Sequence, residues 1–212
     1  MKKPLWDDSF WKHLHPLRLR PEALRFTYTF CLGGCSFLLF LILTFTGILL
    51  AFFYLPVQGK AYQSINDITY LVPFGGFIRN IHYWSGQLII ITLLLHMIRV
   101  FYYRAYRPPR QFNWLVGLGL LVLTFGEDFS GYVLRWDGDT YAATQVATAL
   151  VRIIPGIGHF FYVLLVGGNQ FGEVTVLRFY LLHCMIIPGL MFLLIFYHFW
   201  RVRKDGLAGK AL

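Results

Sequence analysis

Charged residues are scarce in this chain. Only 14% of its 212 residues are charged whereas 57% are hydrophobic, and this balance excludes an ordinary soluble domain. The hydrophobic residues gather in four runs, each long enough to cross a hydrocarbon core of roughly 30 Å. These runs cover residues 27–56, 77–103, 112–134 and 174–200. The sequence therefore predicts an all-α integral membrane protein built on a bundle of four transmembrane helices.

Cysteine is also rare, and its placement excludes two common uses. The three cysteines, Cys31, Cys35 and Cys184, do not suggest a disulfide framework, and no Cys-x-x-Cys-His motif is present. Cys31 and Cys35 are one helical turn apart, which is a poor disulfide geometry within a regular helix. The cysteines thus indicate neither a disulfide-rich secreted domain nor the usual two-cysteine haem attachment.

An apolar core is missing from the first 25 residues, so we expect no cleavable signal. Residues 7–20 instead interleave aromatic and aliphatic side chains with charges, which is typical of an interfacial helix. The predicted organisation is an N-terminal interfacial segment, 1–26, followed by a four-helix domain, 27–212. Within it, the long loop 136–173 contains apolar stretches at 141–154 and 158–166, which we expect to form short surface helices.

The basic residues are divided unevenly between the two sides of the predicted bundle. Four spans place both termini on one side, and 14 of the 19 Lys and Arg residues fall there. The positive-inside rule then predicts that both termini face the cytoplasm, in a bacterial inner or photosynthetic membrane. No nucleic-acid role is indicated, because no basic patch lies on a soluble domain.

Four histidines occur at matched positions in two spans. His82 and His96 are fourteen residues apart in one span, and His183 and His198 are fifteen apart in another. Fourteen helical residues rise about 21 Å and return to within roughly 40° of one face, and fifteen rise about 22 Å with a roughly 60° offset. The two spans run in the same direction because one span separates them. His82 can therefore lie level with His183, and His96 level with His198.

Two matched histidine pairs indicate more than isolated buried residues. A single intramembrane histidine is often a hydrogen-bonded interior residue, although polar groups at this depth are candidates for function. Two neutral imidazoles from facing helices can ligate the iron of a flat haem. We therefore predict that all four histidines are metal ligands, and that His13, His15 and His159 lie on the surface.

Four glycines repeat the same spacing. Gly33 and Gly47, and likewise Gly117 and Gly131, are fourteen residues apart, although glycine costs about 1 kcal/mol in a helix interior. We interpret these positions as places where a flat group presses against the helix backbone. The alternative is ordinary small-residue packing between membrane helices.

Five segments carry a resemblance to a known family. They are Phe-Cys-Leu-Gly-Gly at 30–34, Ile-Arg-Asn-Ile-His-Tyr-Trp-Ser at 78–85, His-Met-Ile-Arg-Val at 96–100, Gly-Tyr-Val-Leu-Arg-Trp-Asp at 131–137 and Leu-Arg-Phe-Tyr-Leu-Leu-His at 177–183. With these segments the chain resembles the cytochrome b/b6 family from about residue 24 onward. It is most similar to the short four-helix b6 type, the N-terminal half of a split cytochrome b.

The resemblance implies three haems. An outer haem b would be ligated by His82 and His183, and an inner haem b by His96 and His198. Arg79 and Arg99 match positions that pair with haem propionates, although both could instead extend to the membrane interface. Cys31 matches the position where the b6 type attaches a haem c, called ci or cn, through a single thioether. The alternative is that Cys31 is a small apolar filler, as we expect for Cys35 and Cys184.

The resemblance also implies an activity and partners. The chain would be the dihaem subunit of a quinol-oxidising Rieske/cytochrome b complex of the b6f-like kind, an oxidoreductase that is incomplete without its partners. Electrons would cross between an outer quinol-oxidising site and an inner quinone-reducing site. The implied partners are a separate C-terminal cytochrome b half supplying a Pro-Glu-Trp-Tyr segment, a Rieske iron-sulfur protein and a c-type cytochrome, in a dimeric complex surrounded by lipid.

Two features depart from the family pattern. Arg135 stands where the family commonly has proline, and Glu127 and Asp128 stand where it has small or apolar residues. An acidic pair within a membrane is costly unless it is neutralised or hydrated. We hypothesise that Glu127 or Asp128 is a catalytic proton acceptor near the outer haem, or a partner of Arg135. The alternative is a water-exposed structural pair.

Two other functions stay open at this point. A haem b membrane anchor of a dehydrogenase or reductase would exchange electrons with quinone at one face only, and would lack a Rieske partner. A transporter or other non-redox bundle would use its histidines as proton relays. The latter predicts a colourless purified protein.

Overall fold

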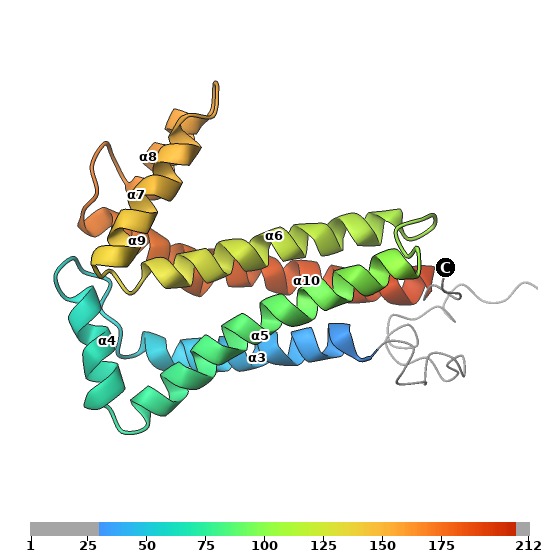
Figure 1. Ribbon diagram of the computed structural model, residues 1–212, viewed down its shortest axis with the longest axis horizontal. Helices are drawn as coiled ribbons and strands as arrows, with labels where there is room; N and C mark the ends of the chain where they lie inside the picture. The colour runs from blue at the N-terminus through green and yellow to red at the C-terminus, as the bar shows by residue number, and fades with distance from the viewer. Residues whose placement is uncertain (1–29, 207–212) are drawn as a thin grey trace, which may run out of the picture.

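The computed structural model describes residues 30–206, and within this range the regular structure is helical. The helices are α3 (Leu32–Ala51), α4 (Ala61–Tyr70), α5 (Gly75–Tyr102), α6 (Gln111–Val133), α7 (Gly138–Arg152), α8 (Gly158–Val166), α9 (Glu173–Leu181), the π-helical turn η3 (Leu182–Ile186) and α10 (Ile187–Asp205). Figure 1 shows α3, α5, α6 and α10 side by side as a long bundle, with the shorter helices at one end.

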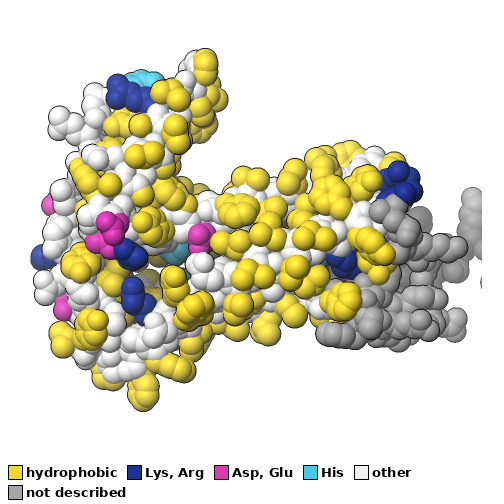
Figure 2. Space-filling view, in the orientation of Figure 1, with side chains coloured by type: hydrophobic (Ala, Val, Ile, Leu, Met, Phe, Trp, Pro, Cys, Tyr) yellow, Lys and Arg dark blue, Asp and Glu magenta, His cyan; other side chains and the backbone are white. Residues whose placement is uncertain are grey.

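Within residues 30–206, four helices are long and apolar enough to cross a membrane. They are α3, α5, α6 and the continuous run Glu173–Asp205, which comprises α9, η3 and α10. The four predicted spans are confirmed, although the first helix ends at Ala51 rather than near residue 56. The flank of the bundle in Figure 2 is almost wholly hydrophobic, and the charged side chains gather toward its ends. Such an outer surface is suited to lipid rather than to water.

The bundle consists of two helix pairs, α3 with α5 and α6 with α10. The pairs meet at mid-length in an apolar cluster to which each long helix contributes one buried side chain: Phe40, Ile89, Leu120 and Met191. This midway cluster divides the bundle. We call the end where α3 begins and α10 finishes the terminal end, and the end with α4, α7 and α8 the loop end.

The loop end has its own core. Val133, Val176 and Phe179 are buried there with Ala61 and Ile68 of α4. α7 and α8 pack on each other and project away from the bundle in Figure 1. The two short helices expected at 141–154 and 158–166 are confirmed, although nothing in the structure places them relative to a membrane surface. The ten-residue α4 was not predicted from the sequence, and the expected interfacial helix at 7–20 lies outside the described residues.

The connection from α6 to α7 is held by Asp137. Its carboxylate accepts a hydrogen bond from the Thr140 backbone N–H at 2.9 Å, and the Thr140 hydroxyl accepts one from the Asp137 N–H at 3.0 Å, which forms a capping box. Arg135 Nε donates to the same carboxylate at 2.9 Å. Burial opposes ionisation, but these hydrogen bonds and the guanidinium prevail and lower the pKa of Asp137. Arg135 therefore pairs with Asp137, and its expected pairing with Glu127 or Asp128 is wrong.

The π-helical turn η3 changes the geometry expected for the fifteen-residue histidine spacing. Hydrogen bonds in a π turn run from i to i+5, so the turn holds one more residue than an α turn. Pro188, the second residue of α10, has no N–H to offer the carbonyl of Cys184. A regular helix would give His183 and His198 an offset of about 60°, and we infer that the extra residue of the π turn brings this offset closer to that of fourteen residues, about 40°.

Two histidine pairs as the candidate functional site

The first pair lies toward the loop end. His82 extends from α5 and His183 from η3, and their ring centroids are 6.1 Å apart with the planes at 80°. A metal–nitrogen bond is about 2.0 Å long, and the centre of an imidazole ring lies roughly 1 Å beyond the bonded nitrogen. Two imidazoles that bind one ion from opposite sides would therefore have ring centres about 6 Å apart. The spacing of these two rings thus fits a single metal ion between them.

Hydrogen bonds orient both imidazoles of this pair. Thr46 Oγ1 donates to the Ile42 carbonyl at 2.7 Å, which leaves the same oxygen to accept from His82 Nδ1 at 2.8 Å. His183 Nδ1 lies 3.1 Å from the Glu127 carbonyl oxygen and 3.2 Å from Ser130 Oγ. A carbonyl oxygen can only accept, so this network assigns the proton to Nδ1 and leaves each Nε2 lone pair for a metal.

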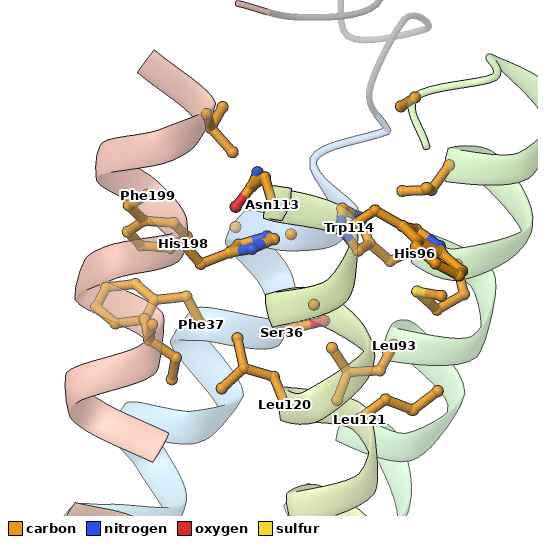
Figure 3. Close-up of a pocket in the computed structure, with 18 of the residues that line it drawn as sticks. Ser36, Phe37, Leu93, His96, Asn113, Trp114, Leu120, Leu121, His198 and Phe199 are labelled. Atoms are coloured by element: carbon orange, nitrogen blue, oxygen red, sulfur yellow. The ribbon is translucent and has the colours of Figure 1, made fainter. Parts of the chain in front are cut away.

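The second pair borders a cavity of about 420 Å³ toward the terminal end. Figure 3 shows His198 directed into the cavity from α10, with His96 on α5 across from it and apolar side chains such as Leu93 and Leu120 between the helices. His198 Nδ1 is buried without a hydrogen bond of ordinary geometry to the described residues, and the backbone of Asn113 lies beside it. This site is roomier and less constrained than the first.

Each of the four spaced glycines faces one of the four histidines. A Cβ atom built on any of them would meet the Cε1 atom of an imidazole on the paired helix, at a distance between 2.6 and 3.5 Å. The flat groups that approach these backbones are therefore the imidazole rings themselves. The pairs are Gly131 with His183 at 2.6 Å, Gly47 with His82 at 3.2 Å, Gly117 with His198 at 3.3 Å and Gly33 with His96 at 3.5 Å.

The other residues expected to bind haem, Cys31, Arg79 and Arg99, also lie at different ends of the bundle. Cys31, at the N-cap of α3, and Arg99, in the last turn of α5, both line the large cavity with His96 and His198. Arg79 lines a smaller polar pocket of about 230 Å³ at the loop end, together with Arg135 and Asp137. Cys31, Cys35 and Cys184 form no disulfide. The structure thus brings Cys31 and Arg99 to one histidine pair, and it places Arg79 outside that cavity.

The acidic pair of α6 separates into two different environments. Glu127 Oε1 lies 3.2 Å from His183 Nδ1, whereas the side chain of Asp128 is exposed. The contact between Glu127 and His183 was not predicted from the sequence. A signal was available, because Glu127 precedes Gly131 by four residues and so lies on the same helix face.

Other polar residues of the large cavity were also missed. Arg110 Nε, Asn113 Oδ1 and Trp114 Nε1 are buried atoms without a hydrogen-bond partner among the described residues, and all three side chains line the cavity. These residues lie at the start of α6, and no repeated spacing in the sequence marked them as part of a site. His159, by contrast, is exposed as expected.

The donor set fits a group that brings most of its own ligands. Across residues 30–206, no cluster of three or more His, Cys, Asp or Glu side chains is arranged to hold a metal ion. Two imidazoles alone fill only two of the coordination positions of an iron ion and leave most of them empty. A haem supplies four equatorial nitrogens and leaves two axial positions, which is what a histidine pair can fill. The fold and this donor set therefore define a helical membrane protein suited to binding haem.

Comparison with known proteins agrees with this class. The family described as Cytochrome b/b6/petB matches residues 19–206. Cytochrome b6 of Heliobacterium modesticaldum is 38% identical over 179 residues, which cover 84% of each chain. Cytochrome b6 of a Synechococcus species is 36% identical over 180 residues, covering 85% of this chain and 83% of the relative.

A solved structure of a hyperthermophilic respiratory Complex III has a chain that superposes with a TM-score of 0.77 and 26% identity. The match covers 84% of the present chain but only 48% of that chain, so this protein spans about half its length. Taken with the family match, this establishes that the chain belongs to the cytochrome b/b6 family.

Proposed function

We propose that this protein is the dihaem cytochrome b subunit of a quinol-oxidising complex of the b6f-like kind, and that it carries electrons across the membrane. The observation that supports this most directly is the pair of histidine sites, one on each side of the midway cluster. An electron path across a membrane needs two such sites in series within one bundle. Each bound haem would supply a one-electron Fe(II)/Fe(III) couple.

The chain itself would position and insulate these groups. His82 and His183 would hold the outer haem b, and His96 and His198 the inner haem b, each through Nε2. Thr46 and Ser130 would keep the loop-end imidazoles in their ligating orientation. The glycines would let each imidazole approach the neighbouring helix without a side chain in the way. The apolar midway cluster would exclude water between the two sites.

Charged residues would hold the haem edges. We propose that Arg99 pairs with a propionate of the inner haem and Arg79 with one of the outer haem, because an arginine fork matches a carboxylate. Cys31 would attach the third haem, a haem c of the ci or cn type, through one thioether at the edge of the large cavity. Its place in the lining of that cavity beside His96 and His198 supports this assignment.

The reaction would need further subunits. We propose that a separate C-terminal cytochrome b half supplies the Pro-Glu-Trp-Tyr segment, and that a Rieske protein and a c-type cytochrome take electrons in a dimeric complex. Both termini would face the cytoplasm, with quinol oxidised at the loop end. Asp128, the more exposed acid of the pair, is the better candidate for accepting a quinol proton.

Haem counting tests this proposal. We expect a reduced-minus-oxidised spectrum of the purified complex to show b-type haem, with two haems per chain removed by acid-acetone and one retained. Cys31→Ser should release the retained haem, and Cys35→Ser should not. His183→Leu or His198→Leu should each remove one b haem, whereas His159→Gln at an exposed position should remove none. A colourless protein would overturn the proposed function, and equal retention after Cys31→Ser would overturn the covalent attachment alone.

A further inference from the structure

We propose that Arg135 holds one propionate of the outer haem, opposite Arg79, and that Asp137 keeps Arg135 in position for this contact. The inference depends on the proposed function, because it requires a haem between His82 and His183. It adds a cofactor-binding residue that the family pattern does not supply, since Arg135 stands where the family commonly has proline.

Arg79 and Arg135 each lie one helical turn beyond a residue of the loop-end site. Arg79 precedes the proposed ligand His82 by three residues on α5. Arg135 follows Gly131, the glycine that lies closest to an imidazole, by four residues. The chain is still turning at that point, because the Arg135 N–H donates to the Tyr132 carbonyl at 3.3 Å. The two cations thus lie on the loop-end side of the histidine pair, one from α5 and the other from the end of α6.

Both arginine side chains line one polar pocket. This pocket of about 230 Å³ is closed on another side by α4, which contributes polar residues such as Asn66 and Thr69. Its charged lining residues are Arg79, Arg135 and Asp137, so two cations face a single carboxylate. An excess of one positive charge is suited to one further anionic group. A propionate of a haem between the loop-end histidines is a carboxylate of the required charge.

Arg135 retains hydrogen-bond donors after its contact with Asp137. Its Nε donates to Asp137 Oδ2 at 2.9 Å, and its Nη2 donates to the same oxygen. A guanidinium carries five N–H donors in a planar fork, so the edge that includes Nη1 is left for a second carboxylate. The side chain is 42% exposed, which gives another anion access to that edge. Arg135 can therefore bridge Asp137 and a propionate.

Asp137 has a fixed position from which to hold this guanidinium. Its Oδ1 accepts from the Thr140 backbone N–H at 2.9 Å within the capping box, while Oδ2 takes the hydrogen bonds of Arg135. The two carboxylate oxygens thus have separate partners. On its other side, Arg135 Cζ lies 5.4 Å from the centroid of the Tyr132 ring. These contacts orient the guanidinium before a haem is bound.

A cation beside a propionate favours the reduced haem. An ionised carboxylate near the iron stabilises the ferric form, and a neighbouring positive charge offsets this preference. Loss of Arg135 should therefore lower the reduction potential of the loop-end haem. Loss of Arg135 also leaves the carboxylate of Asp137 without its cation, which would act in the same direction. The two effects are separated when Asp137 is replaced as well.

The test is an optical redox titration of the two b haems in the intact complex. Arg135→Gln removes the guanidinium, and Arg152→Gln is the matched control, because Arg152 is exposed on α7 and lies outside the pocket lining. In Arg135→Gln we expect both haems to remain and the reduced-to-oxidised ratio of the loop-end haem at fixed potential to fall at least threefold, a shift of about 28 mV at 59 mV per tenfold change. In Arg152→Gln, and for the terminal-end haem in both variants, we expect a change of less than about 1.5-fold, because solvent screens a charge outside the site.

The same change is then made in an Asp137→Asn background. This background has no carboxylate at position 137 for Arg135 to neutralise, so a fall of at least threefold on Arg135→Gln assigns the effect to the propionate. A fall that disappears in this background would show that Arg135 acts only on Asp137, and it would overturn the proposal.

The other outcomes separate this inference from the function beneath it. A wild-type complex without b haem would refute the proposed function. A complex that contains both haems, with no fall in Arg135→Gln or with equal falls in Arg135→Gln and Arg152→Gln, would refute only the role of Arg135.

A second variant covers the case in which Arg135→Gln does not retain the loop-end haem. Arg135→Lys keeps the positive charge but lacks the planar fork, and it is compared with Arg152→Lys in complexes whose haem carries ¹³C at the propionate carboxyl carbons. In redox difference infrared spectra we expect the labelled carboxylate bands of the loop-end haem to shift in Arg135→Lys and to stay in place in Arg152→Lys. Labelled bands that respond alike in the two variants would overturn the proposal.

Discussion

The two histidine pairs have nearly the same spacing along the chain but lie in different surroundings. At the loop end the ring centroids are 6.1 Å apart, and the outer nitrogens of the rings are held by hydrogen bonds that Thr46 Oγ1, Ser130 Oγ and the Glu127 carbonyl oxygen accept. At the terminal end the pair borders a cavity of about 420 Å³, and His198 Nδ1 has no hydrogen bond of ordinary geometry within the described chain.

This difference shows that a repeated ligand spacing specifies where two cofactors can be held but not how tightly. The loop-end site is constrained from behind each ligand, whereas the terminal-end pair borders an open cavity that Cys31 and Arg99 also line. The inner haem b proposed between His96 and His198 would occupy this cavity, and Cys31 at its border would hold the further haem proposed beside it.

The glycines allow the sharpest test of the comparison. A Cβ at position 131 would lie 2.6 Å from His183 Cε1, a distance that requires the ring to move, whereas a Cβ at position 33 would lie 3.5 Å from His96 Cε1, which is ordinary contact. We expect Gly131→Ala to lower occupancy of the loop-end haem about tenfold or more, and Gly33→Ala to leave the terminal-end haem in place. Pyridine haemochrome assay and redox titration measure both.

Gly119→Ala is the matched control. Gly119 lies on the same helix as Gly131, and a Cβ at this position would meet no other atom within 4 Å. This control should retain both haems and gain slightly in helix stability, since alanine is favoured over glycine by about 1 kcal/mol. If Gly131→Ala and Gly119→Ala behaved alike, the close approach of His183 to α6 would not matter for haem binding.

A second, smaller effect is expected from changing the length of η3. Deleting Met185, whose side chain is exposed, should convert the π turn to α-helix and leave His183 and His198 about 40° apart, as in the wild type. Both b haems should then remain, within about twofold of the normal content. Inserting one alanine after Met185 should instead cost the complex one haem. Loss of a haem on deletion would show that η3 does not compensate for the extra residue.

The smallest effect concerns Asp137, which caps α7 near Arg79 and Arg135. Since its pKa is lowered on folding, its contribution to stability is present above the unfolded pKa of about 3.9 and is lost as pH falls through the lower folded value. Asp137→Ala should destabilise α7 by about 1 kcal/mol at pH near 7, and the difference from wild type should shrink toward pH near 3. Hydrogen exchange of α7 in the detergent-solubilised complex measures this.

Asp139→Ala is the comparison variant, because Asp139 is exposed and follows the capping residue by two positions. We expect it to change protection of α7 by less than half as much. A pH-independent difference between Asp137→Ala and wild type would mean that the cap, without its charge, accounts for the whole effect.

Much of the architecture could be predicted because it depends on periodicity and composition. Apolar runs of membrane length located the four spans, and the matched histidines located both sites with their faces. The resemblance gave Cys31 and Arg99 as haem-binding positions, and the structure brings both to the cavity that His96 and His198 line. α4 was missed because ten residues with few strong signals lie between two dominant apolar runs.

The pairing of side chains across helices was harder to predict. Arg135 was expected to meet the acidic residues of α6, yet it pairs with Asp137, because the capping box turns the chain and brings that carboxylate within reach. Glu127 instead meets His183 across the gap between α6 and η3. Such contacts depend on the rotation of each helix about its own axis, which a spacing rule leaves undetermined.

The amino-acid order by itself determined that this is a four-span membrane protein with two histidine pairs at similar depths, because hydrophobic length and helical period are local properties of a chain. Only the tertiary structure decided that each spaced glycine faces one imidazole, that a π turn lies between His183 and His198, and that the side chain of Glu127 lies against His183. These features require the relative rotation and separation of helices, which packing among distant residues sets.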